Sequence, residues 1–214
     1  MTLNVKIKIC ALGALYNGDK PEYLRYCLES LRSQTLALPI ILVVDGPISI
    51  QLEEVLVLFD DLDMRLIRNP DNQGLAAALQ LALNCIGDEF EYVIRFDADD
   101  INAERRFEVT RDYLCRNHVD LVSCHMKEID ANGKVFSERA VPIGADHIRK
   151  RLPYRNPINH PAAAFKISSV LSVVVIRRCL FLKIGISGLV CQKLDLKLRI
   201  LMTTLLIIEQ PMTW

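Results

Sequence analysis

Three carboxylates stand within four residues at the end of an apolar segment. The run Tyr92–Phe96 leads directly into Asp97, Asp99 and Asp100. Like charges crowded at a strand end repel one another, and that cost is usually tolerated where a cation neutralises them. Asp97 and Asp99 are two residues apart, so in an extended segment they would face the same way and offer oxygens to one Mg²⁺ or Mn²⁺. The alternative is a solvated loop whose aspartate caps the following helix.

Two further positions suit ligand contacts. Asp45 closes the continuous apolar run Ile40–Val44, where a carboxylate could accept a hydrogen bond from a base or a ribose. The alternative for Asp45 is a turn residue ahead of Gly46 and Pro47. Gly74 opens a helical segment, and a phosphate could lie on that helix N-terminus, although a plain helix-start residue would look the same.

The elements that must position these side chains alternate between strand-like runs and helical periods, as in stacked βαβ units. The predicted strands are Val5–Leu15, Ile40–Val44, Met64–Arg68 and the run beginning at Tyr92; the predicted helices are Pro21–Leu31, Leu52–Phe59 and Gly74–Cys85. A polar loop follows each strand, at residues 16–20, 45–47, 69–74 and 97–102. In an open parallel sheet such loops share one edge, where ligands bind. We therefore expect an α/β fold with a Rossmann-like, mostly parallel sheet flanked by helices.

The second half of the chain is less regular. Residues 103–117 have helical character, and Leu121–Met126 has the composition of a strand. Asn132 and Gly133 form a hairpin-turn signal between residues 126–129 and 135–136.

Composition excludes several classes of partner. Lys+Arg and Asp+Glu number 26 each, so there is no global basic field for nucleic acid. No segment reaches the ~18 apolar residues of a membrane span. A signal peptide at the N-terminus is a weak alternative, because Val5, Ile7 and Ile9 alternate with lysines as a strand would. The seven cysteines include no C-x-x-C pair, which favours buried thiols in a reducing, cytoplasmic compartment.

Four segments resemble, in order and spacing, the motifs of family 2 glycosyltransferases, especially those of exopolysaccharide and capsule biosynthesis such as the amylovoran group. They are Tyr16-Asn17-Gly18, Val43–Gly46, Asn72–Leu79 and Arg95–Asp100, and the resemblance covers roughly residues 5–166. It implies a GT-A fold that binds a nucleotide-diphosphate sugar with a divalent metal and usually inverts the anomeric centre. A saccharide or a lipid-linked saccharide would be the acceptor.

The resemblance also assigns roles to single residues. Tyr16 and Asp45 would contact the nucleoside, Asp97 would lie near the ribose or the metal, and Asp99 would coordinate the metal. Asn17 and Gly74 would complete the donor side.

A later segment, Asn156–Pro161, resembles the family pattern N-x-x-x-H-P near the acceptor side. Its His160 would touch the donor phosphate or the acceptor, or else be a structural histidine before a rigid proline.

One family feature is absent. The resembling enzymes take the general base from a Glu-Asp pair about twenty residues after the His-Pro segment. Here Val170–Leu182 is apolar and β-branched with Arg177 and Arg178 inside it, and beyond it only Asp195 and Glu209 are acidic. No catalytic base can therefore be named from the sequence.

The tail allows two interpretations. Leu201–Ile208 is strongly apolar with lysines and an arginine upstream, as in a membrane-associating segment at the inner face of the membrane. We favour an out-of-frame translation that begins at about Val173. In the shifted frame each new codon takes the third base of one codon and the first two bases of the next. With a suitable choice of synonymous codons, Leu182–Gly188 then encodes Glu-Asp-Trp-Tyr-Leu-Trp. Val173–Leu182 and Leu201–Gln210 can encode family-like segments in that same frame. Such a tail should pack poorly and leave the sheet edge near the acceptor side uncovered.

These observations predict a GT-A nucleotide-sugar-binding domain over residues 1–166 and an aberrant tail over residues 167–214. The predicted function is sugar transfer in cell-surface polysaccharide synthesis, impaired in this chain. The alternatives are a non-catalytic nucleotide-sugar-binding protein or a non-functional fragment. A nucleotidyltransferase is disfavoured, because the loop after the first strand has no Lys or Arg at its core.

Overall fold

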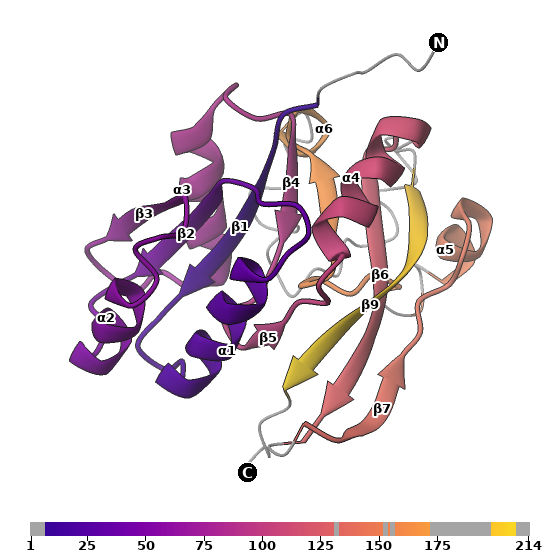
Figure 1. The fold of residues 1–214 in the computed structure, drawn as a ribbon. Coiled ribbons are helices and arrows are strands. Elements are labelled where there is room, and N and C mark those ends of the chain that lie inside the picture. The colour runs from indigo at the N-terminus through magenta and orange to yellow at the C-terminus, as the bar shows by residue number, and fades with distance from the viewer. Residues whose placement is uncertain (1–6, 131–132, 152–153, 155–156, 172–197, 209–214) are drawn as a thin grey trace.

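The fold is described by a computed structural model that covers residues 7–130, 133–151, 154, 157–171 and 198–208. Over these residues the chain forms one sheet with helices on both faces (Figure 1). The strands are β1 (Ile9–Leu15), β2 (Ile40–Asp45), β3 (Met64–Asn69), β4 (Tyr92–Arg95), β5 (Asp100–Ile101), β6 (Leu121–Ile129), β7 (Val135–Arg139), β8 (Ala164–Lys166) and β9 (Leu198–Ile208). The helices are α1 (Pro21–Arg32), α2 (Ile50–Val57), α3 (Leu75–Ile86), α4 (Arg106–Asn117), α5 (Ala145–Arg151) and α6 (Ile167–Leu171).

The strand order is β3-β2-β1-β4-β8-β6-β9-β5, with β7 paired to β6. The first four strands in this order run parallel, and the register places Leu12 opposite both Ile41 and Arg95. The predicted strands, helices and parallel sheet of the first half are therefore confirmed. The predicted first strand is shorter than expected among the described residues, because Ile7 and Lys8 precede its start at Ile9.

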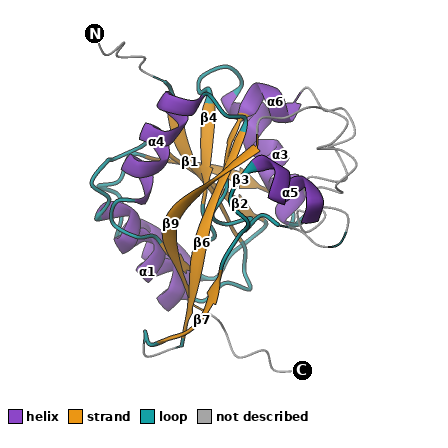
Figure 2. Ribbon diagram, turned by 90° about the vertical axis from the view of Figure 1, so that its right-hand side faces the viewer, coloured by secondary structure: helices purple, strands orange, loops and turns teal. Residues whose placement is uncertain are grey.

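Alternate strand residues supply two separate cores, one on each face of the sheet. Cys10, Leu12 and Val93 pack with α3, α5 and α6, whereas Ala11 and Ile94 pack with α1, α2 and α4. Figure 2 shows α1 and α4 on one side of the sheet, opposite α3, α5 and α6. Every strand that ends at the ligand edge is thereby held from both faces.

Local chemistry fixes where the helices begin. Pro21 opens α1, where its missing N–H costs nothing. The Ser49 hydroxyl accepts a hydrogen bond from the amide of Leu52 at the start of α2, at 3.4 Å. Gly74 stands immediately before α3 with φ at +86°, a backbone conformation that disfavours residues with a Cβ atom.

The second half confirms the predicted hairpin, because β6 and β7 pair antiparallel on either side of Gly133. The strand β8 pairs antiparallel with both β4 and β6. The predicted helix in residues 103–117 begins at Arg106.

One expectation about the tail is wrong. Residues 198–208 form β9, which pairs parallel with β6 and antiparallel with β5, so this sheet edge is not left bare (Figure 1). The segment is rich in Ile, Leu and Thr, residues that suit a strand, and backbone pairing needs no particular family motif.

The described cysteines carry no disulfide. Cys10, Cys27 and Cys124 are buried as predicted, but Cys85 is exposed on the last turn of α3. Cys179 and Cys191 lie outside the described residues. Within the part of the chain that the structure describes, no helix is both long and apolar enough to cross a membrane.

Candidate functional site

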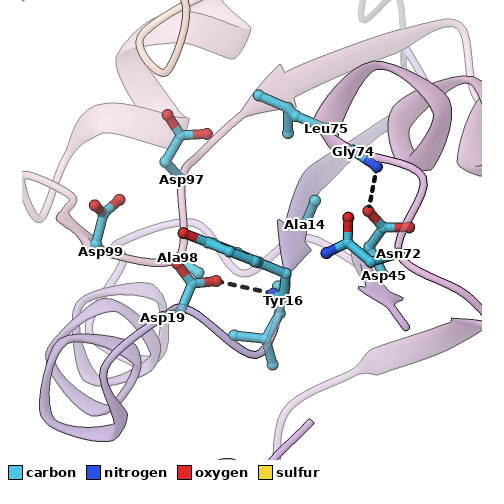
Figure 3. Close-up of a pocket in the computed structure, with 11 residues that line it drawn as sticks. Ala14, Tyr16, Asp19, Asp45, Asn72, Gly74, Leu75, Asp97, Ala98 and Asp99 are labelled. Carbon is cyan, nitrogen blue, oxygen red and sulfur yellow. Dashed lines mark hydrogen bonds between the residues drawn. The ribbon is translucent and has the colours of Figure 1, made fainter. Parts of the chain in front are cut away.

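A pocket of about 310 Å³ opens at the carboxyl ends of β1, β2 and β4 (Figure 3). Its lining residues come from all four predicted loops, from the strand ends beside them and from the first residue of α3: Ala14, Leu15, Tyr16, Asp19, Asp45, Asn72, Gly74, Leu75, Asp97, Ala98 and Asp99. The parallel sheet therefore brings five of the predicted site residues together. In Figure 3 the ring of Tyr16 lies between the carboxylates of Asp97 and Asp99 on one side and Asp45 on the other.

The three clustered carboxylates do not share one environment. Asp97 and Asp99 line the pocket, whereas Asp100 is 2% exposed and is not among the lining residues. Burial and the charge of Asp97 raise the pKa of Asp99, so an added cation would relieve an existing repulsion. The extended segment that the sequence predicted is wrong here, because Ala98 and Asp99 lie in a turn that the Asp100 amide closes by donating to the Asp97 carbonyl oxygen at 3.2 Å. Both Asp97 and Asp99 nevertheless line the pocket.

Asp97 is held by a buried cation. The Nη2 of Arg95 donates to the Oδ1 of Asp97, and the Arg95 side chain is 1% exposed. The same guanidinium donates through Nη1 to the carbonyl oxygens of Leu12 and Phe96 at 2.8 and 2.7 Å. The middle of β1 and the end of β4 are thus tied to the carboxylate that faces the pocket.

Tyr16 is placed by a tight turn. The Oδ2 of Asp19 accepts a hydrogen bond from the Tyr16 amide at 2.9 Å, and the Asp19 amide donates to the Tyr16 carbonyl oxygen at 3.1 Å. A Cβ atom at Gly18 would come within 2.4 Å of the Tyr16 ring, so only glycine leaves room for the ring there. Asn17, by contrast, is exposed and is not among the pocket-lining residues.

Asp19 is a pocket residue that the sequence analysis did not single out. Burial raises the pKa of Asp19 to about 7, with the charges of Asp99 and Asp97 adding to the effect and the Tyr16 amide opposing it. It lies in the loop after the first predicted strand. Its position four residues beyond that strand was the available signal.

Asp45 is buried and its carboxylate is occupied by donors of the chain itself. Oδ1 accepts from the Asn69 side chain at 2.9 Å and from the Gln73 amide at 3.1 Å, and Oδ2 accepts from the Gly74 amide at 2.7 Å. Asp45 therefore fixes the loop that leads into α3. The structure therefore shows the loop-anchoring role, whereas a contact with a base or a ribose stays a prediction for this pocket-lining residue.

His160 lies outside the pocket lining and contacts Arg95, the residue that holds Asp97. Its Nε2 accepts a hydrogen bond from the Nε of Arg95 at 3.3 Å. Burial and the Arg95 charge lower the pKa of His160 to about 3, with Asp97 opposing. Asn159 fixes the same segment by donating to the carbonyl oxygen of Cys124 at 3.0 Å. Asn156, the first residue of the predicted motif, lies outside the described residues.

The pocket fits a hard divalent cation that takes few protein ligands. Asp97 and Asp99 offer carboxylate oxygens, which Mg²⁺ and Mn²⁺ prefer. Among the described residues, no cluster of three or more His, Cys, Asp or Glu side chains could hold a metal alone. Diphosphate oxygens and water would have to complete the coordination.

The region in which the family's general base was expected lies mostly outside the described residues. Arg177, Arg178, Asp195 and Glu209 lie outside the described residues, as does most of the segment 170–182.

The sequence pattern of the family described as Glycosyl transferase family 2 matches residues 14–174. This chain belongs to glycosyl transferase family 2. The match begins at the end of β1 and includes every residue of the pocket lining.

Two curated relatives of this family-2 chain are glycosyltransferases by their names. The amylovoran biosynthesis glycosyltransferase AmsE of Erwinia amylovora is 36% identical over 166 residues, covering 75% of this chain and 60% of the relative. The UDP-Gal:alpha-D-GlcNAc-diphosphoundecaprenol beta-1,3-galactosyltransferase of Escherichia coli is 34% identical over 171 residues, covering 78% and 61%. The chain thus matches about 60% of the length of these relatives.

Solved structures of low sequence identity share the GT-A fold of the family. TarS of S. aureus (1–349), in complex with UDP-GlcNAc, superposes with a TM-score of 0.70 at 15% identity, covering 97% of this chain and 60% of TarS. The mannosyltransferase PcManGT of Pyrobaculum calidifontis, in complex with GDP-Man and Mn²⁺, gives 0.62 at 16% identity, covering 94% and 56%.

Proposed function

We propose that this chain carries the donor-binding site of a metal-dependent glycosyltransferase whose donor is a nucleotide-diphosphate sugar. The observation that carries the proposal is the pair Asp97 and Asp99 facing one pocket, opposite Asp45 and Tyr16. The family supplies the reaction class. The solved complexes of TarS with UDP-GlcNAc and of PcManGT with GDP-Man and Mn²⁺ support the choice of ligand.

The predicted site residues have separate roles in this proposal. Asp99 and Asp97 would hold Mg²⁺ or Mn²⁺, which would stabilise the charge that develops on the leaving diphosphate. The ring of Tyr16 lies against the nucleoside, and Asp45 with the Gly74 loop forms the opposite wall. His160 supports the site from behind, through Arg95.

The test is calorimetric titration with UDP and with GDP, each in the presence and absence of Mn²⁺. The parent chain should bind one of them more tightly with Mn²⁺, and Asp99→Asn should remove that gain while leaving the fold intact. Asp71→Asn is the matched control, because Asp71 is an exposed loop aspartate outside the pocket lining. Equal affinities with and without Mn²⁺ in both the parent and Asp99→Asn would refute the metal assignment.

For the tail, we propose that the sequence from about Val173 is an out-of-frame translation, so that residues 167–214 do not form the family's acceptor wall. The family pattern ends at residue 174, which supports a break near this point. Sequencing the gene tests the idea directly: the alternative frame after the Val173 codon must encode a Glu-Asp-Trp-like motif. If it does not, the tail is genuine and its membrane-associating interpretation replaces this one.

A saccharide or a lipid-linked saccharide is the acceptor in this proposal, at the inner face of the membrane. The lipid-linked acceptor named for the E. coli relative supports this choice. Co-sedimentation of the chain with anionic vesicles, compared with neutral ones, tests the membrane association.

The second candidate is a non-catalytic nucleotide-sugar binder, favoured by the missing Glu-Asp pair. Metal-dependent donor binding without transfer would identify it. A nucleotidyltransferase would instead release pyrophosphate from a nucleoside triphosphate and a sugar phosphate. A coupled assay for pyrophosphate release tests this alternative.

A further inference from the structure

Arg95 is a fully buried cation between the donor pocket and the His-Pro segment. Four acceptors surround its guanidinium: the carbonyl oxygens of Leu12 and Phe96, the carboxylate of Asp97 and the imidazole of His160. They come from β1, from the acidic loop that follows β4, and from the segment before β8. A single side chain thus joins the two parts of the chain that the family resemblance places on the donor and acceptor sides.

The chemistry of the guanidinium suits this position. Arginine carries five N–H donors in a rigid plane, whereas a lysine ammonium carries three. The four contacts therefore exceed what a lysine could satisfy. A buried acceptor left without its donor costs more than the hydrogen bond itself contributes, so the identity of this residue matters beyond its charge.

The hydrogen bond from Arg95 also fixes the protonation state of His160. Because Nε2 accepts a hydrogen bond from the Nε–H of Arg95, its lone pair is occupied and the imidazole proton must be on Nδ1. A protonated imidazolium would instead direct an N–H at the guanidinium. His160 is therefore a neutral hydrogen-bond donor, and neither nitrogen has a free lone pair with which to accept a proton from an acceptor hydroxyl.

We propose that Arg95 is the positioning residue of this site, holding the metal-binding carboxylate of Asp97 and the Nδ1–H form of His160 as one unit, so that His160 does not replace the missing base. The Asp97 half of this proposal rests on the proposed donor function. The His160 half does not, because it concerns only the free protein.

The first measurement is NMR of the chain labelled with ¹⁵N-histidine. The chain has four histidines, and the spectrum of His160→Gln assigns the His160 signals by difference. The parent should show a protonated Nδ1 and a pyridine-type Nε2 from pH 5 to pH 8, and Arg95→Lys should lose that pattern. A protonated Nε2 in the parent overturns the proposal, and this result needs no folded variant of Arg95.

The second measurement is the affinity for UDP or GDP with Mn²⁺ in Arg95→Lys, Asp97→Asn and the double variant. Arg95→Lys should weaken binding on the order of 10-fold to 100-fold, the range of a lost charge-assisted hydrogen bond. In the Asp97→Asn background the same change should have little further effect, because Arg95 acts through that carboxylate. An undiminished effect in the double variant would show a general structural role instead.

Two arginines serve as matched controls. Arg65→Lys alters an exposed pair with Glu89 and should change neither readout. Arg106→Lys removes a buried arginine that contacts the carbonyl oxygens of Arg95 and Pro161 but not Asp97 or His160. It should lower the melting temperature yet keep the His160 tautomer; if it changes the tautomer as Arg95→Lys does, the assignment to Arg95 fails. A parent that binds no nucleotide refutes the proposed function while the NMR result on His160 still stands.

Discussion

The two halves of this sheet are built on different rules. The donor half, residues 9–100, holds four parallel strands, and helices follow the first three of them. The second half, residues 106–208, is joined mainly by antiparallel pairs and by segments that return from far along the chain. In the donor half the loops and strand ends after β1, β2, β3 and β4 deliver polar side chains to one pocket, whereas in the second half Asn159 and His160 form hydrogen bonds within the protein itself. Ligand chemistry therefore gathers in the regular half.

This contrast predicts that the chain keeps donor binding but loses most of its sugar-transfer activity. With no Glu-Asp base in the sequence, the purified chain should transfer sugar about 10²-fold to 10⁴-fold more slowly than a full-length family member, the usual contribution of a positioned base. Donor binding with Mn²⁺ should persist, because its residues all lie in the donor half. A radiolabelled-sugar transfer assay beside calorimetry measures both. Transfer at the rate of a full-length relative would contradict this prediction, whereas hydrolysis of the donor alone would not.

Adding a side chain to the packed core behind the pocket should destabilise the donor half. A Cβ atom at Gly13 would lie 2.3 Å from the fully buried ring of Phe96, which has nowhere to move. Gly13→Ala should therefore cost about 3 kcal/mol in the free energy of unfolding, at the upper end of overpacking effects. Urea unfolding measures it. Adding Phe96→Leu should recover part of the loss, and no recovery would mean that the contact is not its source.

A smaller effect is expected where a strand end meets the loop before α3. Asp45→Asn keeps the shape of the side chain but directs an NH₂ group at one of the amide donors of Gln73 or Gly74. We expect a loss of about 1–2 kcal/mol in unfolding free energy together with weaker nucleotide binding. Asp71→Asn is again the control. If Asp45→Asn keeps both the nucleotide affinity and the unfolding free energy of the parent, the prediction is wrong and Asp45 is an ordinary turn residue.

A pH dependence of stability is expected at Asp19. The pKa of Asp19 is raised to about 7 by burial and by Asp99 and Asp97, so the folded chain holds this proton more tightly than the unfolded chain does. The stability it contributes is fully present below about pH 4 and is lost as the pH rises through about 7.

Asp19→Asn removes this titration while its side-chain oxygen still accepts the Tyr16 amide. The stability of the variant relative to the parent should therefore rise between pH 4 and pH 7 and stay level above. Thermal unfolding across that range, in the absence of metal, measures it. A constant difference would show that Asp19 titrates normally.

The donor half could be predicted from the sequence because its strands, helices and loops are each marked by neighbouring residues. Period and loop position were enough to place Asp45, Gly74, Asp97 and Asp99 at one edge. Asn17, predicted on the donor side, does not line the pocket, because a tight turn closed by Asp19 directs Tyr16 to the pocket and leaves its neighbour exposed.

The second half was predicted less well because its contacts are distant or short. The three-residue strand β8 is too brief to show a period, yet it pairs with both β4 and β6. The apolar run 198–208 could be recognised by composition, but its position between β6 and β5 could not. Arg95 looked like a charge within an apolar run, and only the fold shows that four acceptors surround it.

The pairing of β1 with β4 has a consequence for how the chain is made. This pairing joins residue 9 to residue 92, and the last lining residue of the pocket is Asp99. At about 5–20 residues per second, a ribosome needs on the order of 5–15 s to deliver β4 after β1. During that interval β1 and β2, which are apolar on both faces, have an open edge to the solvent. The nascent protein is therefore most exposed to aggregation, and most dependent on chaperones, just before its ligand site can form.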